Sequence, residues 1–327
     1  GGRRGNPAVI RRGLLRFARK TAKPILGGIY NLRFIKIDMK RLEALGYAVS
    51  KLEIIIGEPV ARRQEAEVLL LDCLELTKVQ LYMEPGAELK PEEESRFSQC
   101  LNRRLNLEPV PYISGYTEFF GLEFYVCPSV LIPRPESELL VEKVVEHIRK
   151  KFGKTDVPLL ISDIGTGSGC LAIALSMSLH HCKVLAIDIS REAIKIARKN
   201  VLKHDVHNRI ELIQGDLLSP LEIPKLDIIV ANLPYIPLAE YEKLSRDELK
   251  YEPSVALFGG SDGLFYINRL LEQTSGKLNQ DSCLFLETGA GQAPVVAEIA
   301  RKYFGRAQVE IFKDLGDVER VVKVYLS

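Results

Sequence analysis

Several short stretches of the 327-residue chain combine small and polar residues in ways that could support chemistry. The first is Asp163-Ile164-Gly165-Thr166-Gly167-Ser168-Gly169, which lies where an apolar stretch gives way to a helical one. Glycines at such a point let the backbone pass close to a ligand, and ligands of parallel α/β sheets bind at the carboxyl ends of the strands. This stretch predicts a ligand-binding loop; a glycine-rich turn without a ligand is the alternative.

Acidic residues follow the next two apolar stretches. Asp188 lies 25 residues after Asp163, where a carboxylate can accept hydrogen bonds from both hydroxyls of a ribose. An aspartate there could instead begin the following helix, but Ser190 is also available for that cap. Asp216 and Leu217 follow the third apolar stretch, near residues 210–213. Asp216 could bind a ligand there, or it could equally be a turn residue.

The glycine spacing separates two kinds of nucleotide-binding protein. A dinucleotide-binding fold needs a glycine at position 170 to complete G-x-G-x-x-G, and Cys170 occupies it. The pattern D-x-G-x-G-x-G instead resembles the first motif of class I methyltransferases, which carries the amino-acid part of S-adenosyl-L-methionine. Asp216 and Leu217 resemble the segment that contacts adenine in that fold. The expected cofactor-binding residues are Asp163, Gly165, Thr166, Gly167, Ser168, Gly169, Asp188, Asp216, Leu217 and Asn232.

The last of these stretches, Asn232-Leu233-Pro234-Tyr235, resembles the (N/D)-P-P-(Y/F) motif of methyltransferases that modify amide or exocyclic amino nitrogens. A planar NH₂ group is a poor nucleophile until acceptors hold its two hydrogens. The Asn232 side-chain oxygen and the Leu233 carbonyl can be those acceptors, and Tyr235 can pack on the planar target. Pro234 keeps Leu233 extended and helps aim its carbonyl.

Leu233 departs from the usual first proline of this motif. The substitution leaves a backbone N–H that proline would lack, but it keeps the carbonyl acceptor. We therefore expect activity to be retained, and the alternative for the whole stretch is a turn that simply ends a strand.

Further segments resemble the HemK/PrmC family, the release factor glutamine methyltransferases, over roughly residues 60 to 327. They include the family's hairpin linker and its L-I-P-R-P-E-T-E signature, in which Ser137 replaces threonine, and Leu315 stands where an aromatic is common. The segments are Pro111-Tyr112-Ile113-Ser114-Gly115, Glu118-Phe119-Phe120-Gly121, Leu131-Ile132-Pro133-Arg134-Pro135-Glu136-Ser137-Glu138, Leu286-Glu287-Thr288-Gly289 with Gln292, and Asp314-Leu315-Gly316-Asp317-Val318-Glu319-Arg320.

The resemblance implies N5-methylation of the glutamine in the Gly-Gly-Gln tripeptide of class 1 peptide chain release factors. On this interpretation, the methyl group passes directly to the nitrogen, and a helical front domain docks the protein substrate. Rival functions are methylation of a nucleic-acid base amino group or of a ribosomal protein glutamine. A catalytically silent binding protein is a further alternative, against which the retained Asp163, Asp188 and Asn232 argue.

Hydrophobic periodicity predicts how these residues are positioned. Helical spacing indicates helices over 59–76 and 91–107, and a period of two from Phe119 to Val126 indicates a strand or hairpin. From residue 158 onward short apolar strands alternate with helices, which indicates a parallel sheet with helices on both faces. Two terminal strands, near 309–312 and 321–325, are expected to pair antiparallel at the sheet edge.

The expected fold is α/β: a class I methyltransferase Rossmann-like seven-stranded sheet with a small N-terminal helical domain. We expect a basic extension over 1–36, a helical substrate-docking domain over 37–113, a hairpin linker over 114–132 and the methyltransferase domain over 133–327.

The net charge of +2 hides an asymmetry. Residues 1–36 contain ten Lys or Arg and no acidic residue, which leaves 35 basic against 43 acidic residues beyond them. Such a basic arm could contact nucleic acid, ribosomes or a membrane surface, or be a transit peptide, although it lacks the serines typical of one. Because the chain begins Gly1-Gly2, an artificial or incomplete start is an equal alternative.

Composition limits the other expectations. With 46% hydrophobic and 27% charged residues and no run of 18 apolar residues, we expect a globular protein without a membrane span. The six cysteines are scattered and form no C-x-x-C pair, which favours reduced thiols in the cytoplasm. The histidines near Cys182 lack ligands at metal spacing, so no metal is expected. We also expect the protein to be a monomer. We expect no nucleic-acid binding outside the basic arm.

Overall fold

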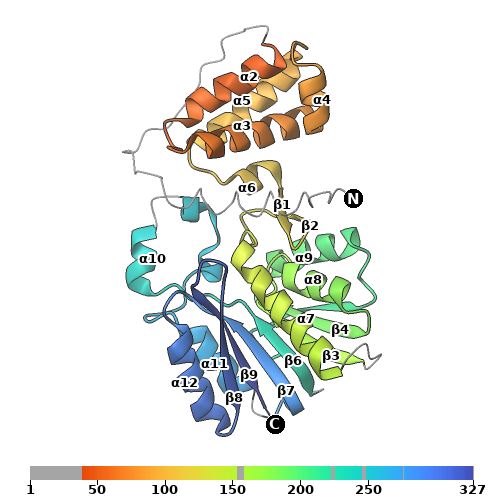
Figure 1. The fold of residues 1–327 in the computed structure, drawn as a ribbon, viewed down its shortest axis with the longest axis vertical. Coiled ribbons are helices and arrows are strands. Elements are labelled where there is room, and N and C mark those ends of the chain that lie inside the picture. The colour runs from red at the N-terminus through yellow and green to blue at the C-terminus, as the bar shows by residue number, and fades with distance from the viewer. Residues whose placement is uncertain (1–38, 153–157, 222–224, 245–247, 275, 327) are drawn as a thin grey trace, which may run out of the picture. The chain divides into compact units, whose positions relative to one another are not determined.

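The computed structural model describes residues 39–152, 158–221, 225–244, 248–274 and 276–326, and the chain divides into two compact units, Gly1–Gly115 and Tyr116–Ser327 (Figure 1). The basic arm over 1–36 lies outside the described residues, so its role stays a prediction. In the described ranges, every helix is too short or too polar to cross a membrane.

The described part of the first unit is helical. Its members are α2 (Arg41–Leu52), α3 (Pro59–Leu74), α4 (Lys78–Met83), α5 (Pro91–Leu105) and α6 (Val110–Ser114). The predicted helices over 59–76 and 91–107 are α3 and α5. Their apolar faces meet in one core, where Leu70 and Leu101 are fully buried. Pro91 begins α5 with three glutamates in its first turn, where carboxylates face the positive end of the helix dipole.

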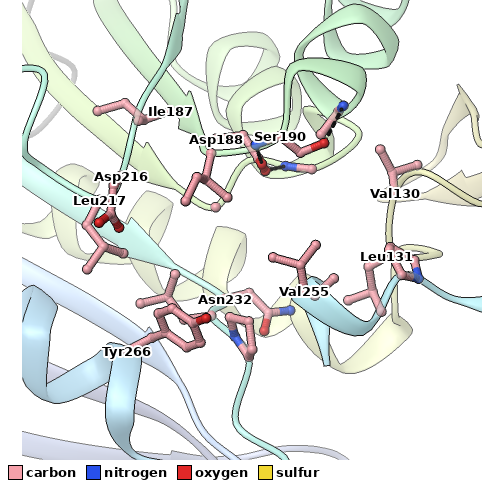
Figure 2. Close-up of a pocket in the computed structure, with 18 of the residues that line it drawn as sticks. Val130, Leu131, Ile187, Asp188, Ser190, Asp216, Leu217, Asn232, Val255 and Tyr266 are labelled. Carbon is pink, nitrogen blue, oxygen red and sulfur yellow. Dashed lines mark hydrogen bonds between the residues drawn. The ribbon is translucent and has the colours of Figure 1, made fainter. Parts of the chain in front are cut away.

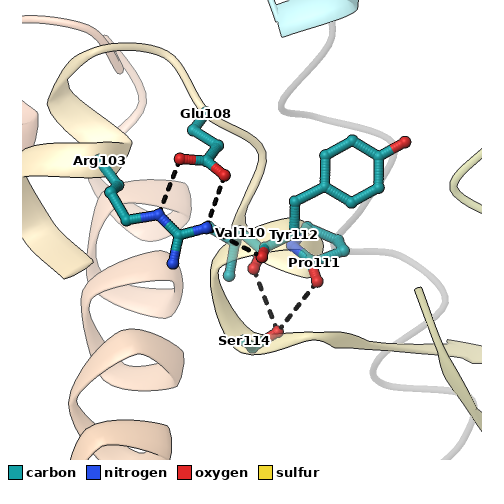
Figure 3. A network of polar contacts seen from close by, with 6 residues as sticks. All are labelled: Arg103, Glu108, Val110, Pro111, Tyr112 and Ser114. Atoms are coloured by element: carbon teal, nitrogen blue, oxygen red, sulfur yellow. Dashed lines mark hydrogen bonds and ion pairs between the residues drawn. The ribbon is translucent and has the colours of Figure 1, made fainter. Parts of the chain in front are cut away.

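A polar network joins the end of α5 to α6 (Figure 3). The Arg103 guanidinium donates two hydrogen bonds to the Glu108 carboxylate, at 2.8 and 2.6 Å, and a third to the Tyr112 carbonyl at 3.2 Å. The Ser114 hydroxyl donates to the Val110 carbonyl at 3.1 Å. These bonds fix the short helix that ends the first unit.

The second unit begins with a hairpin of β1 (Tyr116–Phe119) and β2 (Leu122–Tyr125) and continues into a seven-stranded sheet. Its strands are β3 (Leu159–Ile164), β4 (Cys182–Asp188), β5 (Ile210–Gln214), β6 (Leu226–Ala231), β7 (Leu278–Glu287), β8 (Gln308–Lys313) and β9 (Glu319–Tyr325). The strand order is β5-β4-β3-β6-β7-β9-β8, with β9 antiparallel to both neighbours and the rest parallel. This confirms the predicted α/β fold and its antiparallel terminal pair.

Helices cover both faces of the sheet (Figure 1). On one face lie α7 (Glu138–Phe152), α8 (Cys170–Ser178) and α9 (Arg191–Lys203), and on the other α11 (Phe265–Gln273) and α12 (Ala293–Phe304). Since successive strand side chains point to opposite faces, Ile228 and Val230 of β6 join the first core, while Ile229 and Ala231 join the second.

The registers of the central strands align the loops that carry the predicted site. Ile164 at the end of β3 pairs with Ile187 of β4 on one side and with Ala231 of β6 on the other. The chain runs outward from β3 through β4 to β5 and then returns to β6, so the strand order reverses at β3. Open α/β sheets bind ligands at such a switch point, outside the carboxyl ends of the strands.

Candidate active site

A pocket opens at the carboxyl ends of β3, β4 and β6, where the predicted loops converge (Figure 2). Figure 2 shows Asp188 and Ser190 on one side of it and Asn232 and Tyr266 on the other. The predicted residues that line it are Gly165, Gly167, Asp188, Asp216, Leu217, Asn232, Leu233 and Pro234. Those that do not line it are Asp163, Thr166, Ser168, Gly169 and Tyr235.

Asp163 lies fully buried beneath the glycine loop rather than on the pocket wall. Its Oδ2 accepts hydrogen bonds from the Thr166 hydroxyl at 2.6 Å and from the Ala172 N–H at 3.2 Å, which ties the loop to α8. Burial raises the pKa of Asp163 to about 7, against the effect of these two bonds. Within the described residues, its Oδ1 has no hydrogen-bond partner. The geometry gives Asp163 the role of holding the loop.

Asp188 joins two loops through its carboxylate. Oδ2 accepts from the Gly167 N–H and Oδ1 from the Ser190 N–H, both at 2.8 Å. Burial raises the pKa of Asp188, and the two backbone hydrogen bonds oppose that rise. The cap of α9 is Ser190, whose hydroxyl accepts from the Ala193 N–H at 3.2 Å. Asp188 is therefore not the helix cap that the sequence allowed as an alternative.

Asp216 has a partner that the sequence did not indicate. The Arg269 guanidinium of α11 donates to both of its carboxylate oxygens, at 2.7 and 3.3 Å. Beside it Leu217 adopts a left-handed backbone conformation, with φ of 52°, and its side chain is buried in the pocket wall. The ion pair thus fixes the Asp216–Leu217 turn against α11.

The Asn232 side chain has a defined orientation. Its Nδ2 donates to the Ser137 hydroxyl at 2.9 Å, so the amide oxygen lies on the opposite side of the group. Ser137 ends the 3₁₀ helix η1 (Pro135–Ser137) and is buried. No hydrogen bond from the described residues occupies Asn232 Oδ1 or the Leu233 carbonyl. Both predicted acceptors are therefore available to a ligand.

The loop that leaves β6 is held from behind by two other loops. Gln292 donates from Nε2 to the Tyr235 carbonyl and accepts at Oε1 from the Gly289 N–H, both at 2.9 Å. On the other side, the Ile236 N–H donates to the Leu257 carbonyl at 3.0 Å. These bonds set the backbone on which Asn232 and Leu233 sit.

A Gly263→Ala variant should lose stability and activity together. Gly263 has φ of +79°, and an added Cβ would overlap the Tyr235 carbonyl and the Gln292 amide. A left-handed alanine plus this overlap should cost about 3 kcal/mol. Thermal melting and turnover would both report it. Gly46→Ala is the matched control: it lies in open space on α2 and should be neutral or slightly stabilising, and equal behaviour of the two variants would contradict the proposed packing.

The remaining walls come from segments that the sequence did not assign to the site. They are mostly apolar and include Val130, Leu131, Val255 and Tyr266 (Figure 2). The nearest sequence signal was the L-I-P-R-P-E-S-E segment, which begins at Leu131. These walls are assembled by the fold from distant parts of the chain.

The pocket suits S-adenosyl-L-methionine. Among the described residues that line it, Asp188 and Asp216 are acidic and none is Lys or Arg, which matches a ligand with a positive sulfonium. Asp188 can accept from ribose hydroxyls, and Leu217 and Tyr266 offer apolar surface to a flat base. In the described part of the chain, no group of three or more His, Cys, Asp or Glu side chains is placed to hold a metal ion.

The sheet order, the glycine loop after β3 and the acidic residue at the end of β4 define a class I methyltransferase. The chain belongs to the release factor glutamine methyltransferase family. The enzyme of that name from Moorella thermoacetica is 38% identical over 283 residues, which cover 86% of this chain and 97% of that protein. The enzyme from Geobacter sulfurreducens is 40% identical over 234 residues, covering 72% of this chain and 79% of that protein.

Family models match both units. The PrmC N-terminal domain matches residues 43–115, and ribosomal protein L11 methyltransferase (PrmA) matches residues 145–257. A solved structure, the release factor-specific protein-(glutamine-N5) methyltransferase of Alicyclobacillus acidocaldarius, is 26% identical and covers 62% of this chain and 99% of that one, with a TM-score of 0.38.

Proposed function

We propose that this protein methylates N5 of the glutamine in the Gly-Gly-Gln tripeptide of class 1 peptide chain release factors, with S-adenosyl-L-methionine as donor. The observation that carries the proposal is the Asn232 carboxamide, held by Ser137 at the pocket wall with its oxygen available. The family membership supports the choice of substrate.

The proposed chemistry is a direct transfer. The bound cofactor supplies an electrophilic methyl group, whose bond to sulfur breaks as its bond to the glutamine nitrogen forms, and the nitrogen then loses a proton to water. Asn232 Oδ1 and the Leu233 carbonyl accept the two N–H hydrogens and align the nitrogen. Such alignment can contribute roughly 7 to 11 kcal/mol, so these residues need supply no strong general base. Tyr235 does not line the pocket, and its packing on the planar glutamine amide stays a prediction.

The two units have separate proposed roles. The helical unit, expected over 37–113, docks the release factor; the hairpin segment over 114–132 links it to the methyltransferase domain over 133–327. We propose a monomeric, cytoplasmic enzyme whose partner is the release factor. The basic arm is the one segment with the charge to contact nucleic acid.

Label transfer tests the function directly. The protein is incubated with methyl-labelled S-adenosyl-L-methionine and, in separate reactions, a class 1 release factor, its Gly-Gly-Ala variant, ribosomes, and bulk RNA or DNA. We expect label in the release factor and none in its variant. Label in nucleic acid or in a ribosomal protein would contradict the proposal and identify the rival substrate.

A further inference from the structure

The Asn232 carboxamide can occupy its site in two orientations, and only one of them suits the proposed function, on which this inference rests. With Nδ2 toward Ser137, the oxygen is available to accept a substrate N–H. With the amide turned over, an NH₂ group would face the substrate NH₂, and two donors cannot hydrogen bond to each other. The enzyme therefore needs a group that fixes the orientation.

Ser137 alone cannot fix it. A hydroxyl carries one hydrogen and two lone pairs, so it can accept from Asn232 Nδ2 or donate to Asn232 Oδ1 equally well. The buried Glu287 carboxyl group lies close enough to Ser137 to take part in a hydrogen bond with its hydroxyl, and this second contact can decide the direction. An ionised carboxylate only accepts, so it takes the hydroxyl hydrogen and leaves the lone pairs for Nδ2.

The fold places Glu287 beside Asn232 by strand register. In the parallel pairing of β6 with β7, Ala231 lies opposite Leu286. Asn232 directly follows the last residue of β6, and Glu287 is the last residue of β7, so the two residues lie side by side where these strands end. Glu287 is 2% exposed, and its Oε2 has no hydrogen-bond partner among the described residues. A carboxyl group so placed costs stability, so its position calls for a functional reason.

We infer that Glu287 is a positioning residue. Its ionised carboxylate fixes the direction of the Ser137 hydroxyl, and the hydroxyl then holds the Asn232 oxygen toward the substrate nitrogen. Protonation of Glu287 reverses the direction of these hydrogen bonds. The neutral acid donates to Ser137, the hydroxyl donates onward to Asn232 Oδ1, and the carboxamide presents its NH₂ to the substrate. Turnover should then fail, although no group that touches the substrate has changed its charge.

The surroundings of Glu287 set the pH at which this happens. Burial raises its pKa to about 7, while the Ser137 hydrogen bond and the positive charges of Arg320 and Arg134 oppose the rise and the negative charge of Glu136 adds to it. The Cys170 thiol also faces the carboxyl, but burial raises the pKa of that thiol to about 12, so it is neutral. Below pH about 7 the active orientation should therefore be lost.

Kinetics of the full-length enzyme with a release factor test the inference. We would measure kcat and KM between about pH 6 and 9 at saturating cofactor for the wild type, Glu287→Gln, Ser137→Ala and Ser137→Thr. Wild-type kcat should fall as the pH drops through about 7. Glu287→Gln and Ser137→Ala should lower kcat roughly tenfold to a hundredfold at high pH and leave KM and cofactor affinity unchanged. In both variants, kcat should no longer fall as the pH drops through the acid limb of the profile, the part below about pH 7. Ser137→Thr keeps the hydroxyl and should retain most of the kcat and the limb.

Thermal melting distinguishes a positioning role of Glu287 from a role in stabilising the fold. The folded-state pKa of Glu287 lies above its unfolded value, so its contribution to stability is present at low pH and lost as the pH rises through about 7. Glu287→Gln should therefore melt at or above the wild-type temperature at pH 8.5 while kcat falls. Glu298→Gln, on the exposed face of α12, is the matched control and should change neither quantity.

A second readout does not depend on the substrate. The Asn232 side-chain amide signals of ¹⁵N-labelled enzyme with bound cofactor, identified by their loss in Asn232→Ala, should shift with pH in the wild type and in Ser137→Thr but not in Glu287→Gln. If the wild type leaves the release factor unmethylated, the proposed function fails, and these signals still decide the inference. The inference would be overturned if the Asn232 signals changed neither with pH nor on the Glu287→Gln substitution. It would also be overturned if the Glu287→Gln enzyme kept the wild-type kcat and the wild-type acid limb.

Discussion

An Asn232→Ala variant should turn over about a hundredfold more slowly than the wild type, or slower still, by analogy with the loss of one preorganised polar contact. Alanine leaves one N–H of the substrate amide without its acceptor, and it leaves the buried Ser137 hydroxyl without its donor. The remaining acceptor, the Leu233 carbonyl, would hold the nitrogen by one hydrogen only. Single-turnover kinetics with a release factor and calorimetric binding of the cofactor would measure the two effects separately.

Cofactor affinity should be largely intact in that variant, because the ribose and adenine contacts are proposed for other residues. Asn208→Ala, at an exposed position between α9 and β5, is the matched control and should behave as wild type. Turnover equal to wild type in Asn232→Ala would remove the residue from its proposed role. A loss of cofactor binding as large as the loss of turnover would assign Asn232 to the cofactor instead.

The strands and helices of the second unit were predictable because burial on both faces leaves a strong pattern in the sequence. Continuous apolar runs, such as residues 228–231 in β6, become the central strands, and the alternation with helices dictates parallel pairing. Two helices, α7 and α10 (Leu238–Leu244), were absent from the prediction. In α7 the buried Leu140, Val141, Val144 and Ile148 nevertheless have helical spacing. A signal was therefore present after the proline-rich segment.

The motif residues were predictable as a group but not in their separate roles. Glycine spacing indicates a binding loop, yet it does not distinguish Gly165 and Gly167, which line the pocket, from Gly169, which caps α8 behind it. Asp163 likewise belongs to the motif but lies beneath the loop. Which side a residue faces depends on backbone dihedral angles and packing, and neither has a sequence pattern.

Partners that are distant in the chain were beyond sequence reasoning. Arg269 binds Asp216 across 53 residues, and Ser137 binds Asn232 across 95. These contacts arise because strand order brings the ends of separate segments together, while each segment alone shows only an ordinary polar residue. The hydrogen-bond direction imposed by Glu287 required its burial and the β6–β7 register as well.

Removing the Asp188 carboxylate should weaken cofactor binding about a hundredfold, because we propose that the residue binds the cofactor ribose and because it also holds the glycine loop at the pocket. Its two oxygens accept N–H groups of Gly167 and Ser190, and charge-assisted hydrogen bonds of this kind contribute about 1.5 to 3 kcal/mol each. Asp188→Ala thus loses the proposed ribose acceptor and loosens the glycine loop together. Titration calorimetry with S-adenosyl-L-methionine would give the affinity, and turnover at saturating cofactor should recover much of the wild-type rate.

Asp188→Asn sharpens this test, because the amide has the same shape as the carboxylate but only one acceptor oxygen. Whichever way it is turned, its NH₂ group faces a backbone N–H, either that of Gly167 or that of Ser190, and one loop loses its bond. We therefore expect asparagine to be nearly as damaging as alanine. Glu211→Ala, on the exposed side of β5, should bind as wild type. Wild-type affinity in Asp188→Asn would mean that shape alone matters at this position, and that the carboxylate does not link the loops to the cofactor.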